Sequence, residues 1–285
     1  MKRLIATWWS HGLKKQTIHN ILTPLKEAYH HAMDEGLLTM NPVARTGRLT
    51  RTREDRRAHV APLTAEEVRL LLRTAQAHLP ALFPLLLCAV RTGLREGELI
   101  GLQWGDVDFQ GRFLEVRRGI VRRQVTTTKS HKIRRVDLSP QLTAVLQSLA
   151  ETRALEAGLT GQPRPDWVFL TPAGKRVSET TLRRAFYHCL DRAGLRRVRF
   201  HDLRHTYASL LIQQGAKPKY IQAQLGHGSI QVTMDIYGHL FEGDDRHVVS
   251  RLDDPPAEAV QDRAGEAKSA TQPQPHLDTV ETALA

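Results

Sequence analysis

Cysteine and long apolar runs are both scarce in this sequence of 285 residues. The two cysteines, Cys88 and Cys189, lie far apart in apolar segments, which argues against a disulfide or a metal pair and predicts two buried thiols in a reducing compartment. No apolar run approaches the roughly 20 residues that cross a bilayer. Near the N-terminus, His11 and Lys14 interrupt the chain before an apolar stretch of signal-peptide length is complete. These absences predict a cytoplasmic protein with no membrane partner.

Acidic residues are outnumbered by basic ones. The chain has 41 Lys and Arg against 30 Asp and Glu, which gives a net charge of +11. The excess is uneven, because residues 251–285 contain seven acids and three bases, which leaves 38 bases and 23 acids in the first 250 residues. A body this basic favours a polyanionic partner, most often nucleic acid.

The hydrophobic patterns predict a mainly α protein with a small three-stranded antiparallel sheet, which is an α+β fold class. Apolar residues recur at helical spacing over 17–38, where Pro24 marks a kink near the first turn or a helix start. Thr64 and Glu67 form the capping-box pattern of another helix start. The other predicted elements are a buried helical segment at 81–104, a turn at Gln110–Gly111, strands at 112–120, 121–128 and 133–138, and helices at 139–156 and 178–194.

Composition divides the chain into four parts. Residues 45–61 hold six arginines, two acids and scarcely any core-forming residue, which is typical of an exposed basic linker; a DNA duplex or solvent alone can cover it. From Asp253 onward the chain is rich in Pro, Ala, Gln and acids and has no periodicity, so it is predicted to be disordered. We therefore expect a helical unit at 1–44, the linker at 45–61, the main domain at 62–245 and a largely disordered tail at 246–285.

The pentapeptide HDLRH, from His201 to His205, opens a predicted amphipathic helix with unusual charge. His201, Arg204 and His205 are three and four residues apart, so they share one helix face. The pattern is close to H-E-x-x-H, which binds zinc through two histidines, but Arg204 would place a fixed cation among the ligands and repel the metal. A phosphate fits better, because a guanidinium can bind two of its oxygens at once. The plainer alternative is that Arg204 only pairs with Asp202 or with an acid distant in the sequence.

Three other segments supply residues suited to attack on a phosphodiester. In TGLREGEL, Arg95 is predicted to lie inside an apolar helical segment, where Glu98 three residues later can pair with it. VTTTKSHKIRRVDL places Lys129 at a predicted hairpin turn, and LGHGSIQVTMDIYGHL contributes His227 and then Tyr237. A free tyrosine has a pKa near 10, so nearby cations are needed to make it a nucleophile at neutral pH.

These motifs resemble those of the tyrosine recombinases, or phage integrases. TGLREGEL, TTKS, FHDLRHTYASLL and LGHGSIQVTMDIYGHL occur in the family's order and span roughly residues 60–245. The resemblance implies the family's DNA breaking-rejoining catalytic fold and a site-specific DNA recombinase that works through a 3′-phosphotyrosine. It makes Tyr237 the nucleophile and places Arg95 and Arg204 on the scissile phosphate. It further assigns His201 and His227 to hydrogen bonds with the phosphate, His201 to a share in taking the tyrosine proton, Lys129 to protonating the leaving 5′-oxygen, and Glu98 to orienting the arginines.

Several of these assignments have competitors within the sequence. Lys132 lies in the same turn as Lys129, although the Thr-Lys-Ser context favours Lys129. Tyr207 and Tyr220 compete for the place of the nucleophile, but Tyr207 lies on the apolar stripe of its helix and is expected in the core. His205 is expected to be structural or to support a catalytic neighbour.

The resemblance also implies double-stranded DNA as the partner, a homotetramer on paired sites, and neither metal nor ATP as a cofactor. Residues 1–44 resemble only the last helices of the family's core-binding domain, ending in Asn41-Pro42, and are interpreted as a truncated form of it. A late start in a longer frame and a degraded prophage gene both explain this departure, and poor recombination is expected in either case. A type IB topoisomerase-like enzyme that relaxes DNA and a catalytically weak remnant that only binds DNA are the alternatives.

Overall fold

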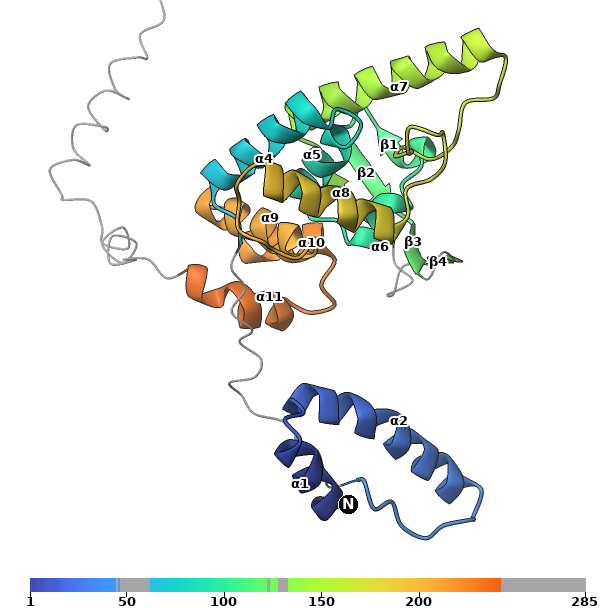
Figure 1. The fold of residues 1–285 in the computed structure, drawn as a ribbon, viewed down its shortest axis with the longest axis vertical. Coiled ribbons are helices and arrows are strands. Elements are labelled where there is room, and N and C mark those ends of the chain that lie inside the picture. Colours follow the sequence, from blue (N-terminus) through green and yellow to red (C-terminus); the bar gives the residue numbers. More distant parts are fainter. Residues whose placement is uncertain (45, 47–61, 122–123, 128–132, 242–285) are drawn as a thin grey trace, which may run out of the picture. The chain divides into compact units, whose positions relative to one another are not determined.

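The computed structural model describes residues 1–44, 46, 62–121, 124–127 and 133–241 (Figure 1). Lys129 and Lys132, the linker at 45–61 apart from Thr46, and the tail at 246–285 all lie outside the described residues. Within the described part of the chain, no helix is long and apolar enough to cross a membrane.

The N-terminal segment contains two helices, α1 (Lys2–Ser10) and α2 (Lys15–Asp34). They share a small core of their own, which consists of Ile5, Ile18, Leu22 and Val43. The placement predicted for Pro24 is wrong: α2 begins at Lys15, so Pro24 lies in the helix interior and not near the first turn. Proline leaves the carbonyl one turn earlier without its helical donor, and the exposed position of Pro24 lets water take that role.

The chain from residue 62 onward is mainly helical. Its elements in order are α4 (Ala65–His78), α5 (Phe83–Thr92), α6 (Glu96–Ile100), η2 (Trp104–Asp106), β1 (Val107–Asp108), β2 (Phe113–Val116), β3 (Arg118–Val121), β4 (Gln124–Thr127), β5 (Arg134–Asp137), α7 (Pro140–Thr160), α8 (Glu179–Arg192), α9 (Asp202–Gln213), α10 (Pro218–Leu225), α11 (Ile230–Tyr237) and η3 (Gly238–Leu240). The buried helix α5 packs against α4, α7 and α9 and forms the centre of the core.

The helix start predicted at Thr64 is confirmed. The Thr64 hydroxyl accepts a hydrogen bond from the N–H of Glu67 (3.1 Å), and the Glu67 carboxylate accepts one from the N–H of Thr64 (2.7 Å). Both residues therefore satisfy donors that the first turn of α4 leaves without helical partners.

The buried segment predicted at 81–104 is not one helix. It breaks at Gly93, which has a left-handed φ of +60°, so α5 ends at Thr92 and α6 begins at Glu96. A Cβ atom at Gly93 would lie 2.5 Å from Cδ1 of Tyr207, so the close approach also requires glycine. Arg95 is consequently the residue before α6 and does not lie inside a helix as predicted.

The predicted fold class is confirmed, although the strands differ in detail. The three-stranded sheet is antiparallel with the order β1-β2-β5, and Leu114 of β2 lies opposite Val136 of β5. The single strand predicted at 112–120 is split at Arg117 into β2 and β3, and β3 pairs with β4 in a separate hairpin. Helix α6 packs on β3, and this contact positions Arg95 and Glu98.

Candidate active site

Three arginines from different elements meet at the C-terminal end of α10. Each donates to one of three consecutive carbonyl oxygens: Arg134 to Gln224 (3.2 Å), Arg204 to Leu225, and Arg95 to Gly226 (3.5 Å). The last carbonyls of a helix lack helical partners and carry the negative end of its dipole, so they attract cations. Arg95 and Arg204, which come from separate motifs, are brought together by this helix end.

Glu98 ties two of these arginines to each other. Its carboxylate accepts hydrogen bonds from the backbone N–H (2.9 Å) and Nη1 (2.8 Å) of Arg95, and from Nη1 (3.0 Å) and Nη2 (2.7 Å) of Arg134. Burial disfavours the charged carboxylate, but the hydrogen bonds and charges of Arg134 and Arg95 outweigh it and hold the pKa of Glu98 at about 2. The predicted pairing of Arg95 with Glu98 is present, and the carboxylate bonds the residue before α6 as in a capping box.

Arg204 is buried, with 4% of its surface exposed. Its Nη1 donates to the carbonyl of Gly93 (2.7 Å) and its Nη2 to that of Leu225, so two backbone carbonyls hold the guanidinium in one orientation. Asp202 pairs with Arg199 (2.8 Å) and not with Arg204, which removes one form of the plainer alternative. No carboxylate in the described part of the chain forms an ion pair with Arg204. Burial, followed by the charge of Arg95, lowers the pKa of Arg204 to about 9.

His227 follows the end of α10, and its side chain contacts a residue of α11. Its Nδ1 lies 2.8 Å from the hydroxyl of Thr233, which is buried. Burial, followed by the charges of Arg204 and Arg95, lowers the pKa of His227 to about 4. The preceding Gly226 has a φ of +64°, and a Cβ atom there would lie 2.6 Å from Cδ of Arg134. The glycine of the LGHG sequence therefore makes room for the arginine cluster.

Tyr237, at the end of α11, is buried with 2% of its surface exposed. Its hydroxyl lies 2.8 Å from Nδ1 of His205, whose ring packs edge-on against that of His201 with centroids 5.3 Å apart. Burial raises the pKa of Tyr237 to about 12, while the charge of Arg204 acts in the opposite direction. Burial therefore outweighs the charge of Arg204 in this arrangement.

The two competing tyrosines have structural contacts. Tyr207 is buried, as predicted, and its hydroxyl donates to Oε1 of Gln224 (3.4 Å). Tyr220 donates to Oδ2 of Asp137 (2.7 Å). The first contact joins α9 to α10 and the second joins α10 to β5, so these tyrosines support the framework of the arginine cluster.

The structure brings together most of the residues singled out from the sequence. Arg95, Glu98, Arg204, His227 and Tyr237 lie in one neighbourhood, and His201 lies at the start of α9 beside it. Their catalytic roles stay predictions. Among the described residues, no three His, Cys, Asp or Glu side chains are grouped where they could hold a metal ion.

Two residues of this neighbourhood were missed as site residues. Arg134 joins the arginine cluster, and His205 contacts the Tyr237 hydroxyl. The sequence did contain a signal for Arg134. Side chains alternate between the two faces of a strand, so Arg134 of β5 lies on the same face as the buried Val136. An arginine on a core-facing position is costly unless other groups compensate its charge, and the carboxylate of Glu98 does so for Arg134.

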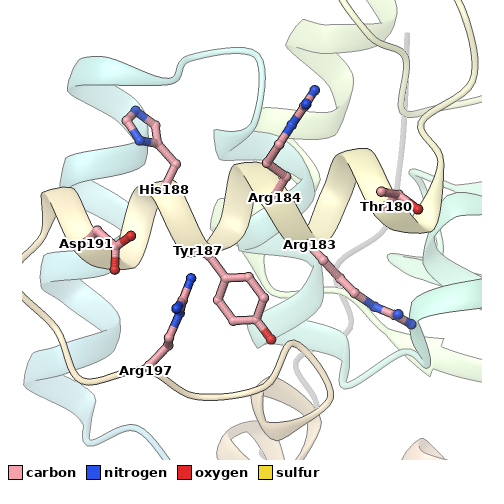
Figure 2. A pocket seen from close by; sticks show the side chains of 7 residues that line it. All are labelled: Thr180, Arg183, Arg184, Tyr187, His188, Asp191 and Arg197. Atoms are coloured by element: carbon pink, nitrogen blue, oxygen red, sulfur yellow. The ribbon is translucent and has the colours of Figure 1, made fainter.

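A basic surface depression lies along α8, which packs against α6. Figure 2 shows its lining side chains, which are Thr180, Arg183, Arg184, Tyr187, His188, Asp191 and Arg197. Arg183 pairs with Glu96 (2.7 Å), the residue that follows Arg95, so the first turns of α8 are tied to α6. Arg197 stacks on the Tyr187 ring, 4.6 Å from its centroid. Three arginines and a histidine therefore give this depression a mainly basic lining, to which Asp191 adds one acid.

Comparison with known proteins identifies the class to which this site belongs. Residues 61–243 match the family described as the phage integrase family. The chain belongs to this family, which comprises the tyrosine recombinases, and the resemblance seen in its motifs is confirmed.

Individual relatives agree with this membership. The chain is 30% identical to "Tyrosine recombinase XerC-like" of Caldanaerobacter subterraneus subsp. tengcongensis, over 89% of this chain and 70% of the relative. It is also 30% identical to "ICEBs1 integrase" of Bacillus subtilis, over 85% of this chain and 67% of that protein. Among solved structures, the integrase of transposon Tn1549 in complex with circular intermediate DNA superposes with a TM-score of 0.71 at 21% identity, covering 88% of this chain and 84% of the other. That likeness establishes a shared fold.

Proposed function

We propose that this chain is a site-specific DNA recombinase that cuts and rejoins double-stranded DNA through a 3′-phosphotyrosine intermediate. The observation that carries the proposal is the convergence of Arg95, Arg134 and Arg204 near Tyr237, with Arg204 buried and without an acidic partner among the described residues. A buried charge without a counterion is costly. Such a site favours an anion of defined shape, and a phosphodiester matches the guanidinium fork.

The proposed reaction needs two proton transfers and one displacement at phosphorus. Tyr237 loses its proton and attacks, the bond to the 5′-oxygen breaks, and that oxygen takes a proton as it leaves. Arg95 and Arg204 stabilise the negative charge that grows on the phosphate oxygens, and His201 and His227 donate further hydrogen bonds. Lys129, outside the described residues, is proposed as the acid for the 5′-oxygen.

This chemistry accounts for strand joining without an energy source. The phosphotyrosine ester keeps the bond energy of the phosphodiester, so attack by a 5′-hydroxyl reverses the first step without ATP. Guanidinium groups supply the charge neutralisation that a divalent cation supplies in other phosphoryl transfers. Exchange between two duplexes breaks four strands, and one tyrosine per strand implies a homotetramer on paired sites.

The basic depression on α8 is proposed as a contact for the DNA backbone. Changing Arg184 and Arg197 together to glutamine is expected to weaken binding to all duplex sequences alike. The plot of log affinity against log salt should also become less steep, its slope falling in magnitude by about two. Fluorescence anisotropy over a salt series measures both effects. Arg153→Gln on α7, where Arg153 pairs with Glu156, is the matched control. An unchanged slope in the double variant would place the duplex elsewhere.

Trapping the covalent intermediate tests the proposed function. The full chain is incubated with a library of nicked duplexes whose central sequence is randomised, so that the cut end diffuses away and the adduct accumulates. Detergent-resistant complexes are isolated, the DNA is sequenced, and the modified residue is located by mass spectrometry. We expect a DNA adduct on Tyr237 and enrichment of particular sequences. Failure to form any adduct, or an adduct on another residue, contradicts the proposal.

A further inference from the structure

The hydroxyl of Tyr237 is held by a residue that the motif comparison did not assign to catalysis. Among the described residues, its hydrogen-bond partner is Nδ1 of His205, 2.8 Å away. Tyr237 is almost fully buried, so solvent is not at hand to receive its proton. The ring of His201 contacts the ring of His205, which in turn lies against the ring of Tyr237.

We infer that His205, and not His201, accepts the proton that Tyr237 loses on attack; this inference rests on the proposed function. As the tyrosine oxygen bonds to phosphorus, its proton moves to Nδ1 of His205. The bond from phosphorus to the 5′-oxygen breaks, and that oxygen receives a proton from a separate acid. The histidine becomes an imidazolium, and returns its proton when the 5′-hydroxyl of the joining strand reverses the step.

The charges around His205 suit this role. The charged and titratable groups that face it come from α9, from the segment before α9, from the segment after α10 and from α11; they are His201, Asp202, Arg204, Arg199, His227 and Tyr237. Burial, followed by His201 and the nearby arginines, lowers the pKa of His205 to about 4. The ring is therefore neutral at neutral pH and able to accept a proton. A bound phosphate offsets the positive charges and raises the affinity of the ring for a proton at the step that needs it.

The test compares His205→Gln with wild type in single-turnover adduct formation on duplexes recovered from the trapping experiment. We expect the rate of adduct formation to fall by about 100-fold or more, which is the usual effect of removing a general base. The pH profile distinguishes proton transfer from packing. Wild type should be nearly independent of pH between about 6 and 9, whereas the variant should gain about tenfold per pH unit, because it depends on the small fraction of ionised Tyr237.

A second substrate separates His205 from the leaving-group acid. It carries sulfur in place of the leaving 5′-oxygen, and a thiolate departs without protonation. On this duplex we expect adduct formation by His205→Gln to remain slow and adduct formation by Lys129→Ala to return to near the wild-type rate. His239→Gln, which changes an exposed histidine two residues after Tyr237, should keep the wild-type rate. His205→Asn replaces the glutamine variant if circular dichroism shows that the latter is unfolded.

The possible results separate this inference from the proposed function. A wild-type rate in a folded His205 variant, or recovery of that variant on the sulfur duplex, overturns the role of His205 while leaving the recombinase chemistry intact. A loss of rate without the gain at high pH also overturns it, since that result is the signature of packing alone. Absence of adduct from wild type on either duplex contradicts the proposed function itself.

Discussion

Arg204→Lys is expected to lower the rate of covalent adduct formation about 100- to 1,000-fold, with little change in the fold. The charge is retained, but a lysine ammonium is a compact point charge and cannot reproduce the planar fork. In wild type that fork donates to the carbonyls of Gly93 and Leu225, which fixes the orientation of the guanidinium at the proposed phosphate site. Removing one preoriented donor to a developing oxyanion costs about 3 to 4 kcal/mol in other enzymes.

Single-turnover adduct formation on a trapped duplex measures this rate, and thermal unfolding reports the fold. Arg196→Lys is the matched control, because Arg196 also bonds a backbone carbonyl, that of Pro62 (2.6 Å), and pairs with Glu67 away from the cluster. The control should cleave at the wild-type rate. If Arg204→Lys also cleaves within a few-fold of wild type, the guanidinium does not act on the phosphate.

Glu98→Gln is expected to lower the free energy of unfolding by about 3 kcal/mol at pH 7. The carboxylate is buried and is the ion-pair partner of both Arg95 and Arg134, so its removal leaves two cations facing each other across a neutral amide. Chemical denaturation measures the change. Glu66→Gln removes an exposed partner of Arg69 on α4 and should cost less than about 1 kcal/mol.

The pH dependence gives this prediction a second signature. The folded pKa of Glu98 is about 2 against an ordinary value of 4.5, so its stabilising contribution is complete above pH 4.5 and is lost as the pH falls toward 2. Stability curves of wild type and Glu98→Gln should therefore converge in acid. A difference that stays constant from pH 7 to pH 3 would show that the glutamine acts through packing and not through lost charge.

The parts of the fold that follow from local patterns were predictable. The Thr64 capping box, the mainly helical class and the burial of Tyr207 all depend on residues close in sequence or on one helix face. The break at Gly93 was not predicted, because the apolar composition continues on both sides of it and the reason for glycine is contact with Tyr207, more than 100 residues later.

The contacts of the site were harder to predict than its members. Motifs indicated Arg95, Arg204 and Tyr237 as a set, but the meeting of the two arginines at the end of α10 depends on backbone carbonyls, which every residue has and no sequence pattern marks. His205 was placed on the correct helix face, yet its contact with Tyr237 depends on how α11 packs against α9. The spacing of residues along the sequence does not predict contacts of this kind between separate helices.

Because main-chain oxygens of α10 hold the arginine cluster, side-chain replacements on the exposed face of that helix leave the acceptors in place. A change in the length of the helix, in contrast, moves these acceptors. Adding or deleting one residue between Pro218 and Leu225 turns the final carbonyls by about 100°, which would withdraw them from Arg95, Arg134 and Arg204 at once. Functional relatives should therefore differ by substitutions within these eight residues and not by insertions or deletions.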